Sequence, residues 1–224
     1  MLLQPKNTVH LAAFDMDGTL LSGRLVFALS EKLGNDDKVK EIQDGSLPGH
    51  EKTRLIAELF AGVSKKDVES AVESIPLAKN CEQAIALLQM QGFRTGIISD
   101  SYTAAAGIVA RRLNMDFVAA NDLEFENGVA TGKVKMPLGW QKIGCKCHLS
   151  VCKRFHLEKY AAEFGVEIGE TVAVGDTRSD ICMVRRAGTG IAFMPKDADI
   201  ARATSNVVRT PDMMQVVTCT LRRT

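Results

Sequence analysis

Two short segments of the sequence carry pairs of aspartates that could bind a metal ion. Asp15 and Asp17 follow an apolar run that ends at Phe14, and Asp176 and Asp180 follow a second apolar run. Carboxylate oxygens are hard ligands, and Mg²⁺ takes a few of them while it keeps waters and phosphate oxygens. Each pair alone could also be a solvated loop or the acidic first turn of a helix. A magnesium site is predicted if the fold brings the two segments together.

A hydroxyl, several backbone amides and a lysine elsewhere in the sequence could bind phosphate. Ser99 offers a hydroxyl donor, and the amides around Asp100 and Ser101 offer N–H groups. Lys153 offers a positive charge at the start of a predicted helix. Several carboxylates facing a phosphate dianion would repel it, so a metal ion and the lysine are both electrostatic requirements of such a site.

These residues can meet only if the elements that carry them converge. Short apolar runs predict buried strands, and segments with helical spacing alternate with them. The predicted strands are 9–14, 93–98, 117–119, 171–174, 190–193 and 206–208, and the predicted helices are 81–91, 104–113, 153–164, 179–187 and 211–221. This alternation is typical of an α/β fold with a parallel sheet covered on both faces. Ligands bind such sheets at the carboxyl ends of the strands, where we expect Asp15, Ser99 and Asp176.

Local signals complete the predicted organisation. The dipeptide Asn127-Gly128 predicts a β-hairpin, and Ser99-Asp100-Ser101 is predicted to be the loop that closes its strand. Between residues 24 and 74 the apolar residues recur at helical spacing and the charge density rises. We therefore predict one core domain, residues 1–20 and 77–224, with a helical cap domain inserted at residues 21–76.

Composition limits the partners. The 224 residues hold 28 Lys and Arg against 27 Asp and Glu, a net charge of +1, and only 5% are aromatic. Neither a basic surface nor a base-stacking surface is indicated, so no nucleic-acid partner is predicted. The sequence has no uninterrupted apolar run long enough for a membrane span and no signal-peptide layout, which predicts a cytoplasmic protein without a membrane partner.

Taken in order, four motifs resemble a known family. They are DMDGTL, IISDS, the lysine of VCKRF, and VAVGDTRSD, and together they resemble the signature motifs of the haloacid dehalogenase superfamily, from about Leu11 to Phe193. The helical insertion between the first two motifs is similar to that of the phosphoserine-phosphatase-like group. This resemblance implies a Rossmann-like parallel sheet core with an inserted small helical cap, and a Mg²⁺-dependent phosphatase that acts on a small phosphorylated metabolite.

The resemblance also implies roles for the first motif. Asp15 would be the nucleophile that forms an aspartyl-phosphate, and a Mg²⁺ ligand. Asp17 would protonate the leaving oxygen and then activate a water, and would bind Mg²⁺ through its backbone carbonyl. That acid–base role calls for a pKa of Asp17 above that of Asp15, through the neighbouring acid and partial burial.

The other motifs would bind the metal ion and the phosphoryl group. Asp176 would be a Mg²⁺ ligand, and Asp180 would hold the waters of the metal. Ser99, the amide at Asp100 and Lys153 would bind the transferring phosphoryl group, and Lys153 would also restrain Asp15 as an anion.

Departures from the family pattern put the substrate in question. Arg24 stands where phosphoserine phosphatases have an acidic residue that recognises the substrate ammonium, which favours a neutral or anionic leaving group. Arg54 lies near the arginine that grips the substrate carboxylate in that group. The alternative for each is an exposed arginine on a helix. Ser99-Asp100-Ser101 also replaces a serine followed by two glycines, which makes the floor of the pocket bulkier and more acidic.

A cysteine-rich segment is the largest departure. The segment 135–151 is longer than the family's usual link, and it introduces Cys145, Cys147, His148 and Cys152. These four side chains could form a zinc site, but no second paired-cysteine motif accompanies them, and ordinary free thiols are the favoured interpretation.

Three other functions remain as alternatives. A phosphotransferase would use the same aspartyl-phosphate with an organic hydroxyl acceptor. A receiver-like domain would keep a long-lived phosphoaspartate and have no use for Asp17. A zinc-stabilised binding module would use the cysteine segment. The sequence predicts neither the physiological substrate nor the oligomeric state.

Overall fold

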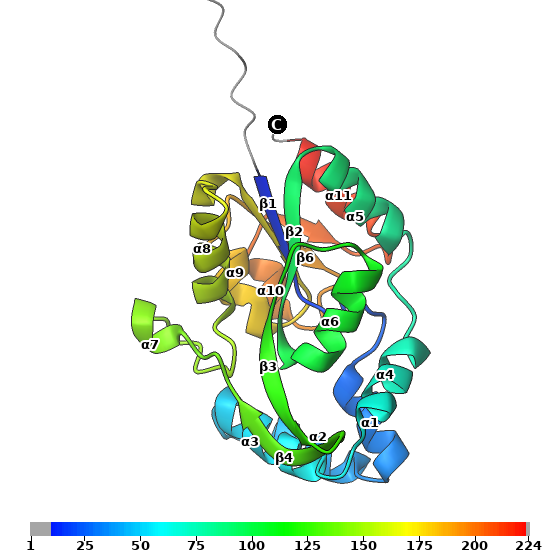
Figure 1. Cartoon of the computed structure of the whole chain (residues 1–224). Helices are drawn as coiled ribbons and strands as arrows, with labels where there is room; N and C mark the ends of the chain where they lie inside the picture. Colours follow the sequence, from blue (N-terminus) through cyan, green and yellow to red (C-terminus); the bar gives the residue numbers. More distant parts are fainter. Residues whose placement is uncertain (1–9, 223–224) are drawn as a thin grey trace, which may run out of the picture.

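A seven-stranded sheet forms the centre of the computed structural model, which describes residues 10–222 (Figure 1). The strand order is β4-β3-β2-β1-β5-β6-β7, and every neighbouring pair is parallel except β3 and β4. The strands are β1 (His10–Phe14), β2 (Phe93–Tyr102), β3 (Phe117–Glu126), β4 (Val129–Lys135), β5 (Thr171–Gly175), β6 (Thr189–Phe193) and β7 (Asn206–Val208). The predicted α/β fold with a parallel sheet is confirmed, although Val9, the predicted first residue of the first strand, lies outside the described residues.

Helices cover both faces of the sheet, because alternate side chains of each buried strand point to opposite sides. Ala12 and Phe14 of β1 belong to one apolar cluster, and Leu11 and Ala13 belong to another. The first cluster includes residues of α5 (Cys81–Met90), α6 (Thr103–Arg112) and α11 (Met214–Leu221), and the second includes residues of α8 (Lys153–Glu163) and α9 (Ile181–Val184). Two smaller helices are α7 (Trp140–Ile143) and α10 (Ala198–Arg202).

Four helices fill the predicted insertion between β1 and β2. They are α1 (Leu25–Leu33), α2 (Asp36–Asp44), α3 (Gly49–Leu59) and α4 (Lys65–Ser74), and they lie together at one end of the molecule (Figure 1). Ser64 and Asp67 form a reciprocal capping box at the start of α4. The predicted helical character of this segment is confirmed.

The β3–β4 hairpin reaches this helical segment. Asn127 and Gly128 adopt positive φ angles of 49° and 83° at its turn, as the Asn-Gly signal predicts. Backbone hydrogen bonds then join the hairpin to the chain between α3 and α4: Gly62 donates to Ala130, Ala130 donates to Val63, and Lys65 donates to Gly128. The helical insertion is therefore fastened to the sheet through main-chain contacts.

The second strand is longer than predicted. Ser99-Asp100-Ser101 was expected in a loop, but β2 continues to Tyr102, which pairs with Asn121 of β3 after an irregularity in the register. The side-chain amide of Asn121 also donates to the carbonyl of Asp100 at 2.6 Å. The extended neighbour β3 keeps these residues in the sheet, a tertiary effect that the apolar run alone does not reveal.

Two predicted helices are shorter than expected. The helix predicted at 179–187 is a 3-10 turn (Arg178–Asp180) followed by the single turn of α9, and Thr177 and Asp180 form a capping box at the start of the 3-10 turn. The closing helix begins at Met214 instead of Pro211, where the carboxylate of Asp212 accepts the amide of Met214. Within residues 10–222, none of the helices combines the length and apolar character needed to cross a bilayer.

Candidate active site

Asp15, Lys153 and Asp180 form a buried ionic cluster. The Nζ of Lys153 donates to Asp15 Oδ1 at 2.7 Å and to Asp180 Oδ1 at 2.5 Å, and these side chains are at most 5% exposed. The amide of Asp15 donates to the carbonyl of Val174, which fixes this residue at the carboxyl end of β1 beside β5. Lys153 is the first residue of α8, so three separate segments meet here as predicted.

The cluster holds more acids than bases. Burial would by itself lower the pKa of Lys153, but the charges of Asp15 and Asp180 hold it well above its usual value. Burial is also the largest influence on Asp15 and raises its pKa, while Lys153 opposes the rise. The sequence analysis expected a raised pKa at Asp17 only. The pKa of Asp15 rises because this side chain is buried together with other carboxylates.

Asp176 adds a third buried carboxylate. Its Oδ1 atom has no hydrogen-bond partner among the described residues, and oxygens of Asp15, Asp176 and Asp180 lie within 4.8 Å of one another. Burial and the charge of Asp180 raise the pKa of Asp176 to about 7. Gly18 lies against this carboxylate with φ of +87°, and a Cβ there would stand 2.2 Å from Asp176 Oδ2. An unpartnered oxygen among crowded carboxylates is a donor set that fits a divalent cation such as Mg²⁺.

Asp180 also fixes the loop that carries Asp176. Its Oδ2 atom accepts the amides of Asp176 and Thr177, both at 3.0 Å, so it fixes the loop that carries Asp176. A Cβ on Gly175 would stand 2.3 Å from the Cβ of Asp180, so this close approach needs a glycine. Asp180 therefore orders both Asp176 and Lys153.

Asp17 points toward the start of the helical insertion. Its Oδ1 atom accepts the amide of Leu25, the first residue of α1, at 2.8 Å. Burial raises the pKa of Asp17 to about 6, against the opposing influences of the Leu25 amide and the charge of Arg24. A carboxyl group with this pKa can hold a proton and release it near neutral pH, as a general acid and base must.

Ser99 and Asp100 lie at the end of β2. Ser99 is completely buried, and its hydroxyl oxygen accepts the amide of Ser101 at 3.2 Å. Asn121, which the sequence analysis did not single out, holds this end of β2 by donating to the carbonyl of Asp100 and to the hydroxyl of Ser150. No local motif marks Asn121, because its role arises from the pairing of β3 with β2.

A cavity of about 840 Å³ opens between the helical insertion and the sheet edge. Chain neighbours of the buried cluster line it, among them Asp17, Asp100, Ser101 and Thr177. Basic side chains also line it, from segments far apart in the sequence: Arg24, Lys52, Lys146, Arg178 and Arg185. Only Arg24 was singled out from the sequence. The other four follow no motif and converge through the fold.

The two predicted substrate-binding arginines differ in position. Arg24 lines the cavity, and its Nη1 atom donates to Gln43 Oε1 at 3.1 Å. Arg54 does not line this cavity. It pairs with Glu51 at 3.0 Å and with Glu58 at 2.6 Å on an exposed face of α3, because these acids stand three residues before it and four after it. The structure does not bring Arg54 to the site, and the alternative of an exposed helix arginine describes it.

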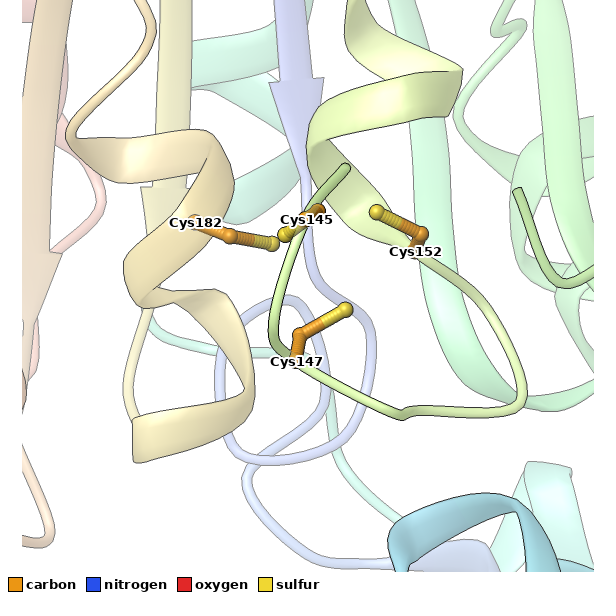
Figure 2. A group of neighbouring side chains, drawn as sticks. All are labelled: Cys145, Cys147, Cys152 and Cys182. Atoms are coloured by element: carbon orange, nitrogen blue, oxygen red, sulfur yellow. The ribbon is translucent and has the colours of Figure 1, made fainter. Parts of the chain in front are cut away.

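Cys145, Cys147 and Cys152 converge beside the cavity with a fourth cysteine, Cys182 (Figure 2). His148, which the sequence grouped with the first three, is not a member of this group. Its ring instead packs against Trp140, with the two ring centres 4.7 Å apart. Cys182 comes from α9 and follows no cysteine spacing, so only the fold reveals it.

Comparison with known proteins agrees with this geometry. A family model described as haloacid dehalogenase-like hydrolase matches residues 12–185. The chain is 32% identical over 195 residues to phosphoserine phosphatase SerB2 of Mycobacterium tuberculosis (strain ATCC 25618 / H37Rv), an alignment covering 85% of this chain and 46% of that protein. It is also 32% identical over 195 residues to phosphoserine phosphatase of Lactococcus lactis subsp. lactis (strain IL1403), covering 84% of this chain and 85% of that protein.

A solved structure of similar architecture is a phospho-aspartyl intermediate analogue of phosphoserine phosphatase. It superposes with a TM-score of 0.81 at 25% identity, covering 94% of this chain and 98% of that chain. The similarity therefore includes the helical insertion as well as the sheet.

Proposed function

Because the chain belongs to the haloacid dehalogenase-like hydrolases, we propose that it hydrolyses a small phosphorylated metabolite through an aspartyl-phosphate on Asp15, with Mg²⁺ bound. The family and the relatives identify it as a phosphatase of the phosphoserine-phosphatase-like group. The observation that carries the finer proposal is the buried carboxylate of Asp15, hydrogen-bonded to Lys153 at the edge of the sheet beneath a cavity.

Asp15 is the proposed nucleophile. One of its carboxylate oxygens attacks phosphorus, a new O–P bond forms, and the bond between phosphorus and the leaving oxygen breaks. Asp17 supplies a proton to the leaving oxygen as the electron pair moves onto it. In the second step Asp17 takes a proton from water, the water oxygen attacks phosphorus, and the carboxylate of Asp15 is regenerated. A pKa near 6 suits Asp17 to both proton transfers.

The remaining polar groups would hold the metal ion and the phosphoryl group. Asp15, Asp176 and the backbone carbonyl of Asp17 would bind Mg²⁺, with Asp180 beside them. The ion supplies positive charge that offsets the repulsion between phosphate and the carboxylates. The hydroxyl of Ser99, the amide at Asp100 and the ammonium of Lys153 would bind the phosphoryl oxygens.

Residues 21–76 are proposed to act as a cap over this site. The cavity lies between their helices and the sheet edge, with Arg24, Val26 and Ile56 on the cap side. A cover of this kind limits the access of bulk water and places side chains against the leaving group. Substrate selection would then reside mainly in the cap.

The cavity lining favours a substrate whose leaving group is neutral or anionic. Arg24, Lys146 and Arg185 line the cavity, and none of them forms an ion pair with another of the described residues. With Lys52 and Arg178 the lining has five basic residues against three acidic ones, and this excess of positive charge attracts anionic groups and repels an ammonium group. A phosphorylated carboxylic acid without an amine therefore fits this lining better than phosphoserine does.

Exchange of Asp15 tests the proposal directly. The Asp15→Asn enzyme should lose essentially all hydrolysis of a generic aryl phosphate in the presence of Mg²⁺, because the amide is a poor nucleophile. The matched control is Asp122→Asn, which changes an exposed aspartate of β3 and should keep activity. Unchanged activity of D15N in a properly folded sample would overturn the assignment of the nucleophile. Product analysis with added alcohols then separates hydrolysis from phosphotransfer.

A further inference from the structure

Four cysteine sulfurs lie together outside the proposed phosphate site. The Sγ atoms of Cys145, Cys147, Cys152 and Cys182 all lie within 4.8 Å of one another. Cys145 and Cys147 come from the loop after α7, Cys152 precedes the first turn of α8, and Cys182 lies in α9. Figure 2 shows the side chains entering from these segments toward a shared centre.

The spacing of the sulfurs fits one metal ion. A tetrahedral ion with Zn–S bonds of about 2.3 Å holds its sulfurs about 3.8 Å apart. The four sulfurs all lie within 4.8 Å of one another, a separation that accommodates this spacing. An iron–sulfur cluster distributes its cysteines over two or more irons, so its ligand sulfurs lie farther apart than those around a single ion. A disulfide would join only two of the four sulfurs and would leave the convergence of the others unexplained.

We propose that Cys145, Cys147, Cys152 and Cys182 bind a structural zinc ion, one per chain. Four cysteine ligands and no open position for water are the pattern of structural zinc sites, in contrast to catalytic ones. The inference does not depend on the proposed phosphatase mechanism, because none of these cysteines takes part in it.

The local backbone is arranged for such a site. Gly144 and His148, which flank the Cys145–Cys147 turn, both adopt positive φ angles, so the loop reverses sharply around the sulfurs. The amide of Arg154 donates to Cys182 Sγ at 3.4 Å, which links the start of α8 to α9. Hydrogen bonds of this kind to ligand sulfurs are the usual outer support of a metal centre.

A bound ion would stabilise the segment between β4 and α8, which has little hydrophobic packing of its own. Between β4 and α8 the only regular element in the structure is the single turn of α7, and none of its residues is buried. Val151 and Cys152 at the end of the segment are buried, but the part of the loop around α7 is weakly held by hydrophobic packing. A zinc ion with four protein ligands contributes folding free energy of its own and would order it.

The position of the site links it to the catalytic segments. Cys152 directly precedes Lys153, and Cys182 follows Asp180 by two residues. The side chains of Lys153 and Asp180 are themselves hydrogen-bonded at 2.5 Å. One ion bound to both cysteines would therefore hold the two segments together from the outside. Cys145, Cys147 and Cys182 also line the cavity, so the bound loop would form part of its wall.

Metal analysis of the full chain tests the proposal. Wild-type protein purified without chelators should contain about one zinc per chain by mass spectrometry of the elements. Cys147→Ser should lower the zinc content to a small fraction of that value. Cys219→Ser changes a cysteine outside the group and is the matched control, which should keep the full content. Equal zinc content in C147S and wild type would overturn the proposal.

Wild-type protein alone provides a second test if C147S does not fold. Protein expressed with cobalt should show the visible absorption of tetrahedral cobalt with thiolate ligands. In native protein the four thiols of the group should react with a thiol reagent only after a chelator removes the metal, whereas the buried Cys81 should resist before and after chelation. Metal-free wild type that takes up no cobalt, iron in place of zinc, or a disulfide within the group would each overturn the assignment.

The two proposals are separable by experiment. The Asp15→Asn protein should be inactive and yet contain the same amount of zinc as wild type. Failure of the aryl phosphate assay in zinc-loaded wild type would count against the proposed function only. Absence of zinc from fully active wild type would count against this inference only.

Discussion

Lys153 is the only cation hydrogen-bonded to the buried acids among the described residues, and its ammonium group contacts Asp15 and Asp180. Removing one partner from a buried ionic cluster leaves charge without compensation. In Mg²⁺-free buffer at pH 7, Lys153→Met should lower the free energy of unfolding by about 3–5 kcal/mol. Urea unfolding monitored by circular dichroism measures this loss. Lys159→Met on the exposed face of the same helix is the matched control and should change stability little.

The loss of unfolding free energy in K153M should become smaller as the pH falls. Burial raises the folded-state pKa values of Asp15 and Asp176 above the unfolded value of about 3.9. A carboxyl group with a raised pKa contributes stability that is complete below the unfolded pKa and is lost as the pH rises through the folded pKa. Without Lys153 the pKa of Asp15 rises further, so the deficit should shrink as the pH falls from 7 toward 4. A deficit that stays constant over this range would contradict the electrostatic origin of the effect.

Arg24 provides a test of substrate choice. Arg24→Glu should raise the kcat/KM for phosphoserine relative to that for a phosphorylated acid without an amine, on the order of tenfold or more, because an acid near the cavity attracts the ammonium group. Steady-state assays on both substrates give the ratio. Arg54→Gln, in the same helical segment but outside the cavity, should leave the ratio unchanged. An unchanged ratio in R24E would mean that Arg24 only faces solvent.

At the scale of elements, α4 depends on its capping box. The hydroxyl of Ser64 accepts the amide of Asp67, and the carboxylate of Asp67 accepts the amide of Ser64. Ser64→Ala should lower the free energy of unfolding by about 1 kcal/mol, while Ser74→Ala at the other end of the helix should cost less. Thermal and urea unfolding of both variants measure the difference. Equal losses of unfolding free energy in the two variants would argue against a stabilising role of the capping box.

The stability that Asp67 contributes should change with pH in the opposite direction to the stability contributed by the buried acids. Hydrogen bonds from Lys32 and Ser64 hold the pKa of Asp67 well below its usual value. A lowered carboxyl pKa gives stability above the unfolded value near 3.9, and that stability is lost as the pH falls through the folded pKa. The deficit of S64A should therefore be fully present at neutral pH and smaller in strong acid.

Elements with a local signal could be predicted from the sequence, and those shaped by their neighbours could not. The hairpin turn at Asn127-Gly128 was predicted from a dipeptide whose φ angles the structure confirms. The extension of β2 through Ser101 depends on β3 beside it. It is not encoded in the residues of the strand alone.

At the scale of the whole molecule, the crowded carboxylates predict dependence on a divalent cation. Removal of metal with a brief EDTA treatment should abolish aryl phosphate hydrolysis, and added Mg²⁺ should restore it, because Asp15, Asp176 and Asp180 otherwise repel a phosphate dianion. Activity measured before and after each step checks this. Full activity in metal-free buffer would contradict the magnesium assignment.

The candidate site was predictable where strand ends carry it. Asp15, Ser99 and Asp176 could be placed together from the rule that ligands bind at the carboxyl ends of parallel strands. Cys182, Asn121 and the basic lining from Lys146 and Arg185 could not, since each reaches its partners only through the folded chain. The place of Arg54 outside the cavity could not be predicted either, because spacing along a helix does not say which face the helix turns inward.

The hydrogen bonds between the β3–β4 hairpin and the α3–α4 connection bear on how a ligand reaches and leaves the enclosed space. Any movement that lifts the four-helix insertion as a rigid body must stretch the bonds from Gly62 to Ala130 and from Lys65 to Gly128. Rotation about this junction keeps them intact. Deuterium uptake at the Gly62 and Lys65 amides during turnover would therefore report whether passage of the ligand proceeds by detachment or by pivoting.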